Sequence, residues 1–129
     1  IEEIRPSGQR ELIGTFIRAN KLTVIEFTGE EIEEVMNFDI ANCLKRFTDK
    51  SVIWKSAQLN CPMLTGDKKM REIAVKIGIE VHGSIWVIDE LFNTGLISSE
   101  KAIKLLEQLL MTNSCLPKNE IERRINKLK

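Results

Sequence analysis

The feature that most constrains the fold is an alternation of short apolar runs with longer segments of helical spacing. The short runs cover residues 22–27, 63–65 and 79–81, and helical segments precede, separate and follow them. Strands that are separated by helices pair in parallel, and the crossover helices cover the faces of the sheet. We therefore predict an α/β fold, with a three-layer parallel sheet flanked by helices and a helical C-terminal tail over residues 98–129.

Apolar residues at helical spacing, together with local start and stop signals, predict where the helices lie. A capping box at Thr28 and Glu31 begins a helix that breaks near residues 37–39 and continues towards Phe47. Ser84 is predicted to cap the helix that follows the last strand. The other helices are expected over residues 9–20, 48–60, 67–77, 98–112 and 118–129.

Composition excludes several kinds of site. Lysine plus arginine and aspartate plus glutamate both total 19, so the net charge is zero. A protein that holds nucleic acid by bulk positive charge is not balanced in this way, and any nucleic-acid contact must be local. The single histidine and the three widely spaced cysteines give no zinc signature and no disulfide framework. Carboxylates are the groups that remain for chemistry.

The chain is 129 residues long and 43% hydrophobic, which is enough for the core of a single domain. No apolar run approaches the roughly 18 residues of a membrane span, and no charged-then-apolar leader is visible. We therefore expect a cytoplasmic protein with no membrane partner. The chain opens at Ile1 rather than at a methionine. Because three strands are few for a parallel sheet, we expect a strand ahead of Ile1 and regard residues 1–129 as one domain that is incomplete at its N-terminus.

Two acidic residues begin the helices on either side of the second strand. Asp49 opens the helix before this strand, and Asp67 opens the helix after it. If the first helix runs back antiparallel to the strand, both carboxylates converge at the carboxyl edge of the sheet, where open parallel sheets bind ligands. Converging carboxylates with no histidine or cysteine beside them suit Mg²⁺ or Mn²⁺. Taken singly, Asp67 also fits a helix cap and Asp49 a first-turn charge.

Residues 47–83 carry motifs of a known family. A D-K-S sequence at residues 49–51 stands at a helix start, and an L-T-G-D sequence at residues 64–67 ends a strand. This stretch resembles the C-terminal half of a PIN domain. The tail that follows is similar to a bacterial PIN-like subfamily of predicted nucleic-acid-binding proteins and to VapC-type toxins.

The resemblance implies a Mg²⁺- or Mn²⁺-dependent endoribonuclease. PIN domains use four acids to hold divalent ions, which lower the pKa of water and stabilise charge on the scissile phosphate. The implied metal-binding and catalytic acids are Asp49, Asp67 and Glu3, which lies in an opening I-E-E-I sequence. Glu2 is the neighbouring alternative to Glu3. The first acid of the family, at the end of its first strand, has no counterpart in residues 1–129.

The resemblance also assigns roles to neighbouring side chains. The hydroxyls of Ser51 and Thr65 would orient the carboxylates or metal-bound water, and Lys68 and Lys69 would contact RNA phosphates. The alternatives are backbone capping by the two hydroxyls and a solvated helix face for the two lysines. Arg71 is expected on that solvated face.

The implied partners are an RNA substrate and, if the chain is the toxin of a toxin–antitoxin pair, an antitoxin protein. The leucine-rich helix over residues 98–112 offers a surface for a homodimer, unless its apolar stripe packs on the domain itself. The alternative function is a catalytically inactive PIN-like module that binds nucleic acid or protein.

Overall fold

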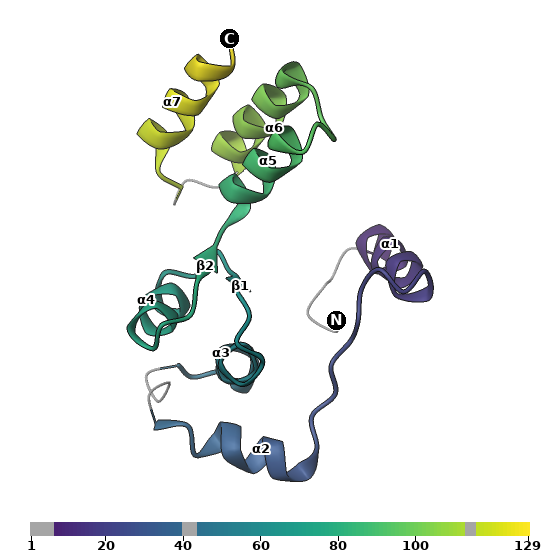
Figure 1. The fold of residues 1–129 in the computed structure, drawn as a ribbon, viewed down its shortest axis with the longest axis vertical. Coiled ribbons are helices and arrows are strands. Elements are labelled where there is room, and N and C mark those ends of the chain that lie inside the picture. The colour runs from purple at the N-terminus through teal and green to yellow at the C-terminus, as the bar shows by residue number, and fades with distance from the viewer. Residues whose placement is uncertain (1–6, 40–43, 113–115) are drawn as a thin grey trace. The chain divides into compact units, whose positions relative to one another are not determined.

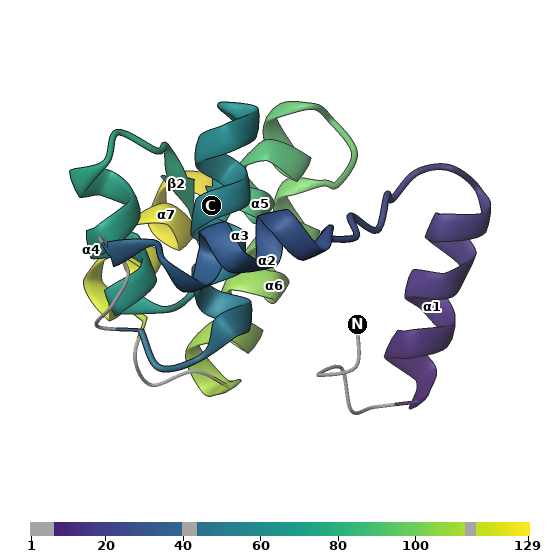
Figure 2. The ribbon, with the colours of Figure 1, turned by 90° about the horizontal axis from the view of Figure 1, so that it is seen from below.

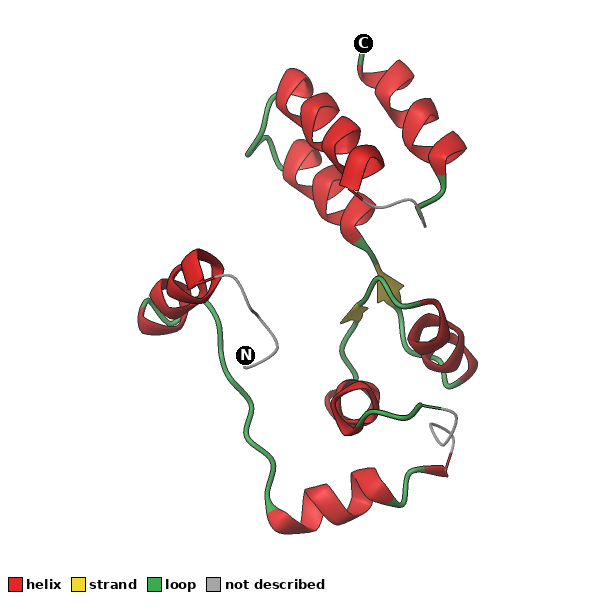
Figure 3. Ribbon diagram, turned by 180° about the vertical axis from the view of Figure 1, so that it is seen from behind, coloured by secondary structure: helices red, strands yellow, loops and turns green. Residues whose placement is uncertain are grey.

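The structure, a computed structural model, describes residues 7–39, 44–112 and 116–129. Helices predominate among these residues, and the two strands are short (Figures 1 and 3). The chain divides into two compact units, Ile1–Glu34 and Val35–Lys129. The elements, in chain order, are α1 (Ser7–Arg18), α2 (Gly29–Met36), α3 (Phe47–Leu59), β1 (Met63–Leu64), α4 (Lys68–Lys76), β2 (Val81–His82), α5 (Ser84–Asn93), α6 (Ser99–Thr112) and α7 (Lys118–Leu128).

The capping box at the start of α2 is confirmed. The backbone N–H of Glu31 donates to Thr28 Oγ1 at 3.2 Å, and the backbone N–H of Thr28 donates to Glu31 Oε2 at 3.1 Å. This reciprocal pair satisfies two of the donors that a helix N-terminus leaves open. The predicted break is also confirmed, because α2 ends at Met36. The predicted continuation towards Phe47 includes residues 40–43, which lie outside the described residues.

The strand predicted over residues 22–27 is wrong. Residues 23–28 form neither helix nor strand, and the side chains of Leu22, Val24 and Ile25 are between 44% and 47% exposed. A β-branched run has a high strand propensity, but propensity becomes a strand only where a neighbouring strand pairs with it. The sequence shows the propensity and cannot show the pairing.

The two remaining strands pair in parallel, as predicted. Met63 lies opposite Val81 and Leu64 opposite His82. The backbone N–H of Met63 donates to the Glu80 carbonyl at 2.8 Å, and that of Thr65 donates to the His82 carbonyl at 3.0 Å. Within the described residues the sheet has these two strands, and the fold is a helix-rich α/β arrangement with a small parallel sheet. The three-layer arrangement and the single domain over residues 1–129 stay predictions.

A first hydrophobic core joins α3, α4 and the sheet. Helix α3 packs on β1 and α4, and α4 packs on β2. The predicted apolar stripe of α4 is confirmed, since Met70, Ile73 and Ala74 are buried and Ile77 packs against them. The buried residues of this core are Leu44, Ile53, Met63, Met70, Ile73, Ala74 and Ile79.

A second core joins the three C-terminal helices, in which α6 packs on both α5 and α7 (Figures 1 and 2). Its buried residues are Ile88, Ala102, Leu106, Ile121 and Ile125. The leucine-rich stripe of α6 therefore packs within the chain, which was the alternative to a dimer surface. One detail of this region differs from the prediction. The cap of α5 is Gly83 rather than Ser84, and it makes no side-chain capping hydrogen bond.

Two helix ends use left-handed backbone, as their residue types predict. Asn60 follows α3 with φ 47°, and Gly78 follows α4 with φ +81°. Asparagine and glycine are the residues that adopt this conformation most readily, so both act as stop signals. None of the described helices is both long and apolar enough to cross a membrane.

Candidate functional site

The loop after β1 places Asp67 at the start of α4. Asp67 has extended backbone, and its Oδ1 accepts a hydrogen bond from the backbone N–H of Met70 at 2.9 Å. The backbone N–H of Asp67 in turn donates to Thr65 Oγ1 at 3.1 Å. Asp67 is therefore a helix cap, as the simpler interpretation predicted. A carboxylate has two oxygens, so a cap made through Oδ1 is compatible with a cation bound through the other oxygen.

Asp49 lies in the first turn of α3 and is half-buried. Its neighbour Ser51 is buried, and the Ser51 hydroxyl donates to the Thr48 carbonyl at 2.8 Å. This hydrogen bond turns the hydroxyl back onto the first turn of α3 and is not a helix cap. A role for Ser51 beside a metal stays a prediction. The hydroxyl of Thr65 is engaged in a similar way, because it contacts Met70 Sδ at 3.7 Å in addition to accepting from Asp67.

The course of α3 bears on whether Asp49 and Asp67 converge. In Figures 1 and 3 helix α3 is seen along its axis, whereas the chain through β1 runs across the view. Helix α3 thus crosses the strand direction instead of running back antiparallel to β1, and the premise from which we derived convergence is not met. That the two acids share one site stays a prediction.

The metal-binding prediction has a further requirement, which is the number of ligands. Among residues 7–39, 44–112 and 116–129, no group of three or more histidine, cysteine, aspartate or glutamate side chains is placed to hold an ion. Glu3 lies outside the described residues. Mg²⁺ binds through as few as one or two carboxylates, with water and substrate phosphates completing its shell. Asp67, whose Oδ1 caps α4, leaves one carboxylate oxygen for an ion held in that open way. That Asp49 joins it stays a prediction.

The basic residues beside Asp67 differ in the contacts that they make. Lys68 and Lys69 are exposed, and Lys68 Nζ lies 3.9 Å from Glu72 Oε1. Arg71 is also exposed, as predicted for a solvated face, and it makes one contact with the neighbouring loop. Its Nη2 donates to the Thr65 carbonyl at 3.3 Å, which ties the guanidinium to the loop between β1 and α4. Gly83 makes room for this contact, because a Cβ at that position would stand 3.0 Å from Arg71 Nη2.

The carboxyl end of β2 carries an aromatic pair that the sequence interpretation missed. The rings of His82 and Trp86 are stacked, with centroids 4.0 Å apart and an interplanar angle of 19°. His82 Nε2 also lies 2.9 Å from Glu80 Oε1. Trp86 remains 41% exposed, whereas Trp54 is 6% exposed. The sequence signal for this stacked pair is that His82 and Trp86 are four residues apart. A strand ends at the first of them, and the second lies in the first turn of the helix that follows.

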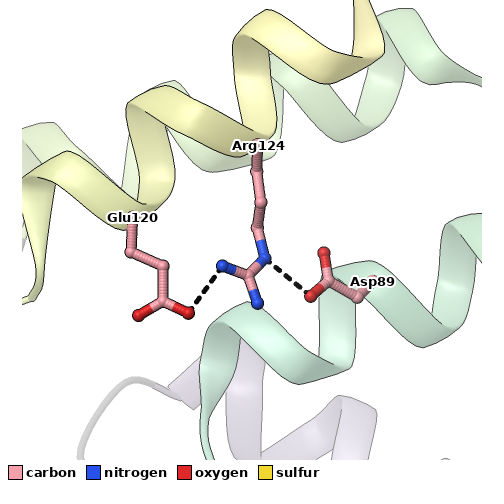
Figure 4. Close-up of polar contacts among 3 residues, drawn as sticks. All are labelled: Asp89, Glu120 and Arg124. Atoms are coloured by element: carbon pink, nitrogen blue, oxygen red, sulfur yellow. Dashed lines mark hydrogen bonds and ion pairs between the residues drawn. The ribbon is translucent and has the colours of Figure 1, made fainter.

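Asp89, an acidic residue of α5, is paired with α7. Its Oδ2 accepts from Arg124 Nε at 2.8 Å, and Arg124 Nη1 donates to Glu120 Oε1 at 2.7 Å (Figure 4). The hydrogen bond that Arg124 donates to Asp89 is the main reason that the pKa of the Arg124 guanidinium is raised, and Glu120 adds to the effect. Asp89 is therefore part of the packing between α5 and α7.

Comparison with known proteins gives one match. No curated protein and no solved structure matches the chain. A family model described as PIN domain matches residues 1–129. The match covers the whole sequence, including the D-K-S and L-T-G-D motifs. The chain therefore belongs to the PIN domain family, which indicates a nuclease-type function on nucleic acid.

Proposed function

We propose that the chain is a Mg²⁺- or Mn²⁺-dependent endoribonuclease of the PIN type. The observation that carries the proposal is the parallel pairing of β1 and β2, which sets the loop bearing Asp67 at the carboxyl edge of the sheet. Ligands of open parallel sheets bind at this edge. The family match supplies the nuclease-type chemistry, and the carboxylate donors suit a hard divalent cation.

In this proposal Asp67, Asp49 and Glu3 hold the ion. When bound, the ion would supply Lewis-acid stabilisation of charge on the scissile phosphate and a lowered pKa for water. The contribution of Asp67 is positional, because the hydrogen bond from Met70 N–H holds its carboxylate at the start of α4, and the backbone N–H of Asp67 donates to Thr65 Oγ1. Because the carboxylate is already held in place, it would lose less conformational freedom on binding a cation.

The lysines that follow Asp67 supply charge for the substrate. Lys68 and Lys69 are exposed in the first turn of α4, next to the proposed metal site. The N-terminus of a helix already favours anions, and ammonium groups there add to the attraction for a phosphate backbone. The zero net charge of the chain makes such a local arrangement necessary.

Calorimetric titration of the complete gene product with Mn²⁺ and Mg²⁺ tests the metal site. We expect binding in the micromolar to millimolar range that Asp67→Asn abolishes, followed by cleavage of single-stranded RNA that depends on the ion. Asparagine is a good helix cap, so this variant removes the charge and keeps the cap. Ser98→Ala is the matched control, because it removes a different helix cap, the Ser98 Oγ that accepts from Lys101 N–H. Absence of metal binding by the complete protein would overturn the nuclease proposal.

A second candidate is a catalytically inactive module that binds nucleic acid or protein. It is favoured by the ligand count, since the described residues assemble no group of three metal ligands. The same titration separates the two candidates. RNA binding without metal binding and without cleavage would identify the inactive module.

A role as the toxin of a toxin–antitoxin pair is a further part of the proposal. It predicts that expression of the complete gene arrests growth, that Asp67→Asn relieves the arrest, and that an antitoxin protein binds the chain. Expression without any effect on growth would leave the nuclease and overturn the toxin role. A homodimer, also predicted, is tested by the mass of the protein in solution.

A further inference from the structure

We propose that His82, Trp86 and Arg71 form a subsite that stacks a base of single-stranded RNA at the carboxyl end of β2. The subsite rests on the proposed action on RNA and specifies how the strand is held, independently of the metal. It lies in a cleft of about 390 Å³, whose lining includes the three residues and also Lys68, Gly83 and Ser84.

The aromatic part of the subsite is an exposed, preorganised platform. Stacking on His82 fixes the ring of Trp86 from one side, and the residue as a whole is nevertheless 41% exposed. Proteins that bind single-stranded nucleic acid stack bases on such side chains, because every base has a π-face. Trp54 provides the contrast within the same chain, since it is buried and serves the packing of α3.

The cationic part is also held in place before any ligand binds. The hydrogen bond from Arg71 Nη2 to the Thr65 carbonyl brings the guanidinium to the loop at the sheet edge, against the backbone of Gly83. A guanidinium is planar and binds phosphate oxygens through two donors, so a fixed one is suited to the phosphate next to a stacked base. Lys68, at the rim of the same cleft, adds a mobile charge.

The other charges in the cleft largely cancel. Arg124 and Glu120 also line it, and they are bonded to each other at 2.7 Å. Glu80, 2.9 Å from His82, and Glu72, 3.9 Å from Lys68, lie outside the lining of the cleft. Among the residues that line it, Arg71 and Lys68 remain once Arg124 is set against Glu120, so the lining itself is positive. An aromatic platform beside positive charge selects a base with its phosphate over an acidic protein segment.

The test is fluorescence anisotropy with a dye-labelled, single-stranded oligouridine of about ten nucleotides, measured in EDTA so that neither metal nor cleavage contributes. Loss of one stacked base weakens binding by about 5- to 100-fold, and we expect this for Trp86→Ala. Trp86→Phe keeps a ring and should restore most of the affinity. Gly83→Ala, which displaces Arg71, should weaken binding by a smaller factor. Leu96→Ala, at a residue that is 73% exposed and outside the cleft lining, is the control.

Each outcome separates this proposal from the proposed function. Trp86→Ala that binds RNA as tightly as the unmodified protein overturns the subsite and leaves the nuclease intact. An equal loss of affinity for a duplex RNA of the same length overturns base stacking, since paired bases are not available to the ring. A selective loss for the single strand, in a protein that proves unable to bind Mn²⁺, supports the subsite while the nuclease fails. No RNA binding in EDTA overturns the subsite, and the metal titration then decides the nuclease. Unchanged circular dichroism and melting of Trp86→Ala exclude unfolding as the cause of its lost affinity.

Discussion

Arg124 Nε lies 2.8 Å from Oδ2 of Asp89, and this contact joins the last helix, α7, to α5 across 35 positions of sequence. The same guanidinium bonds Glu120, one turn earlier on α7. Both partners of the long-range pair are about 70% buried at the side chain. The ion pair therefore links α7 to α5 beside the second core.

The Asp89–Arg124 pair should have a measurable coupling energy. We expect a double-mutant cycle of Asp89→Ala and Arg124→Ala, followed by urea unfolding, to give about 0.5–1 kcal/mol in the free energy of unfolding. The reason is that the pair is partly buried and well aligned. The exposed pair Lys68–Glu72, with 3.9 Å between Nζ and Oε1, is the control and should couple by only a few tenths of a kcal/mol. Equal coupling in the two pairs would show that burial is unimportant here.

The pH dependence of this pair follows from the direction of the pKa shift. The pKa of Arg124 is raised in the folded state, mainly by its hydrogen bond with Asp89. A raised pKa of a cation gives stability that is fully present below the unfolded pKa and is lost as pH rises through the folded pKa. Both values are strongly alkaline for arginine. The coupling energy should therefore be unchanged between about pH 7 and about pH 10. A clear decline over that range would show that Arg124 is not the titrating group.

The second core should depend strongly on Leu106. Its side chain is fully buried between α5 and α7, so Leu106→Ala leaves a cavity and should lower the free energy of unfolding by about 2–5 kcal/mol. Leu96→Ala removes the same atoms from a residue that is 73% exposed, and it should change stability by less than about 0.5 kcal/mol. Urea unfolding followed by far-ultraviolet circular dichroism measures both. Similar values for the two variants would contradict the packing described here.

The turn after α4 should be sensitive to loss of glycine. Gly78 has φ +81°, and nothing lies within 4 Å of a Cβ placed on it. The cost of Gly78→Ala is therefore a backbone cost, of about 1–2 kcal/mol. Gly66→Ala is the matched control, because it has equal space and no left-handed backbone. It should leave stability unchanged or raise it by up to about 1 kcal/mol. Thermal unfolding of the two variants distinguishes steric from conformational effects.

Local signals in the sequence predicted local structure well. The Thr28–Glu31 capping box, the apolar stripe of α4 and the stop at Asn60 all appear in the structure. Each of these depends on residues within one or two helical turns, for which sequence spacing and spatial spacing are the same thing. The parallel pairing of the strands was also predicted, because strands of one sheet that are joined by a helical crossover run in the same direction.

Features that depend on pairing or direction could not be predicted in the same way. Residues 22–27 have strand propensity and no strand. The convergence of Asp49 and Asp67 was derived from an antiparallel course of α3, and α3 instead crosses the strands (Figure 3). The tie between Arg71 and Thr65 and the stacking of Trp86 on His82 depend on where loops place side chains. Spacing alone does not encode such tertiary geometry.

Asp67 has two roles that substitution can separate, the cap of α4 and the proposed metal ligand. Asp67→Ala removes the acceptor for Met70 N–H and should lower the free energy of unfolding by about 1 kcal/mol, whereas Asp67→Asn keeps an acceptor and should stay within a few tenths. Urea unfolding without metal measures the cap alone. Added Mn²⁺ should then stabilise the unmodified protein and leave both variants unchanged, because binding to the folded state alone raises stability. Equal stabilisation of Asp67→Asn by Mn²⁺ would show that Asp67 is a cap and nothing more.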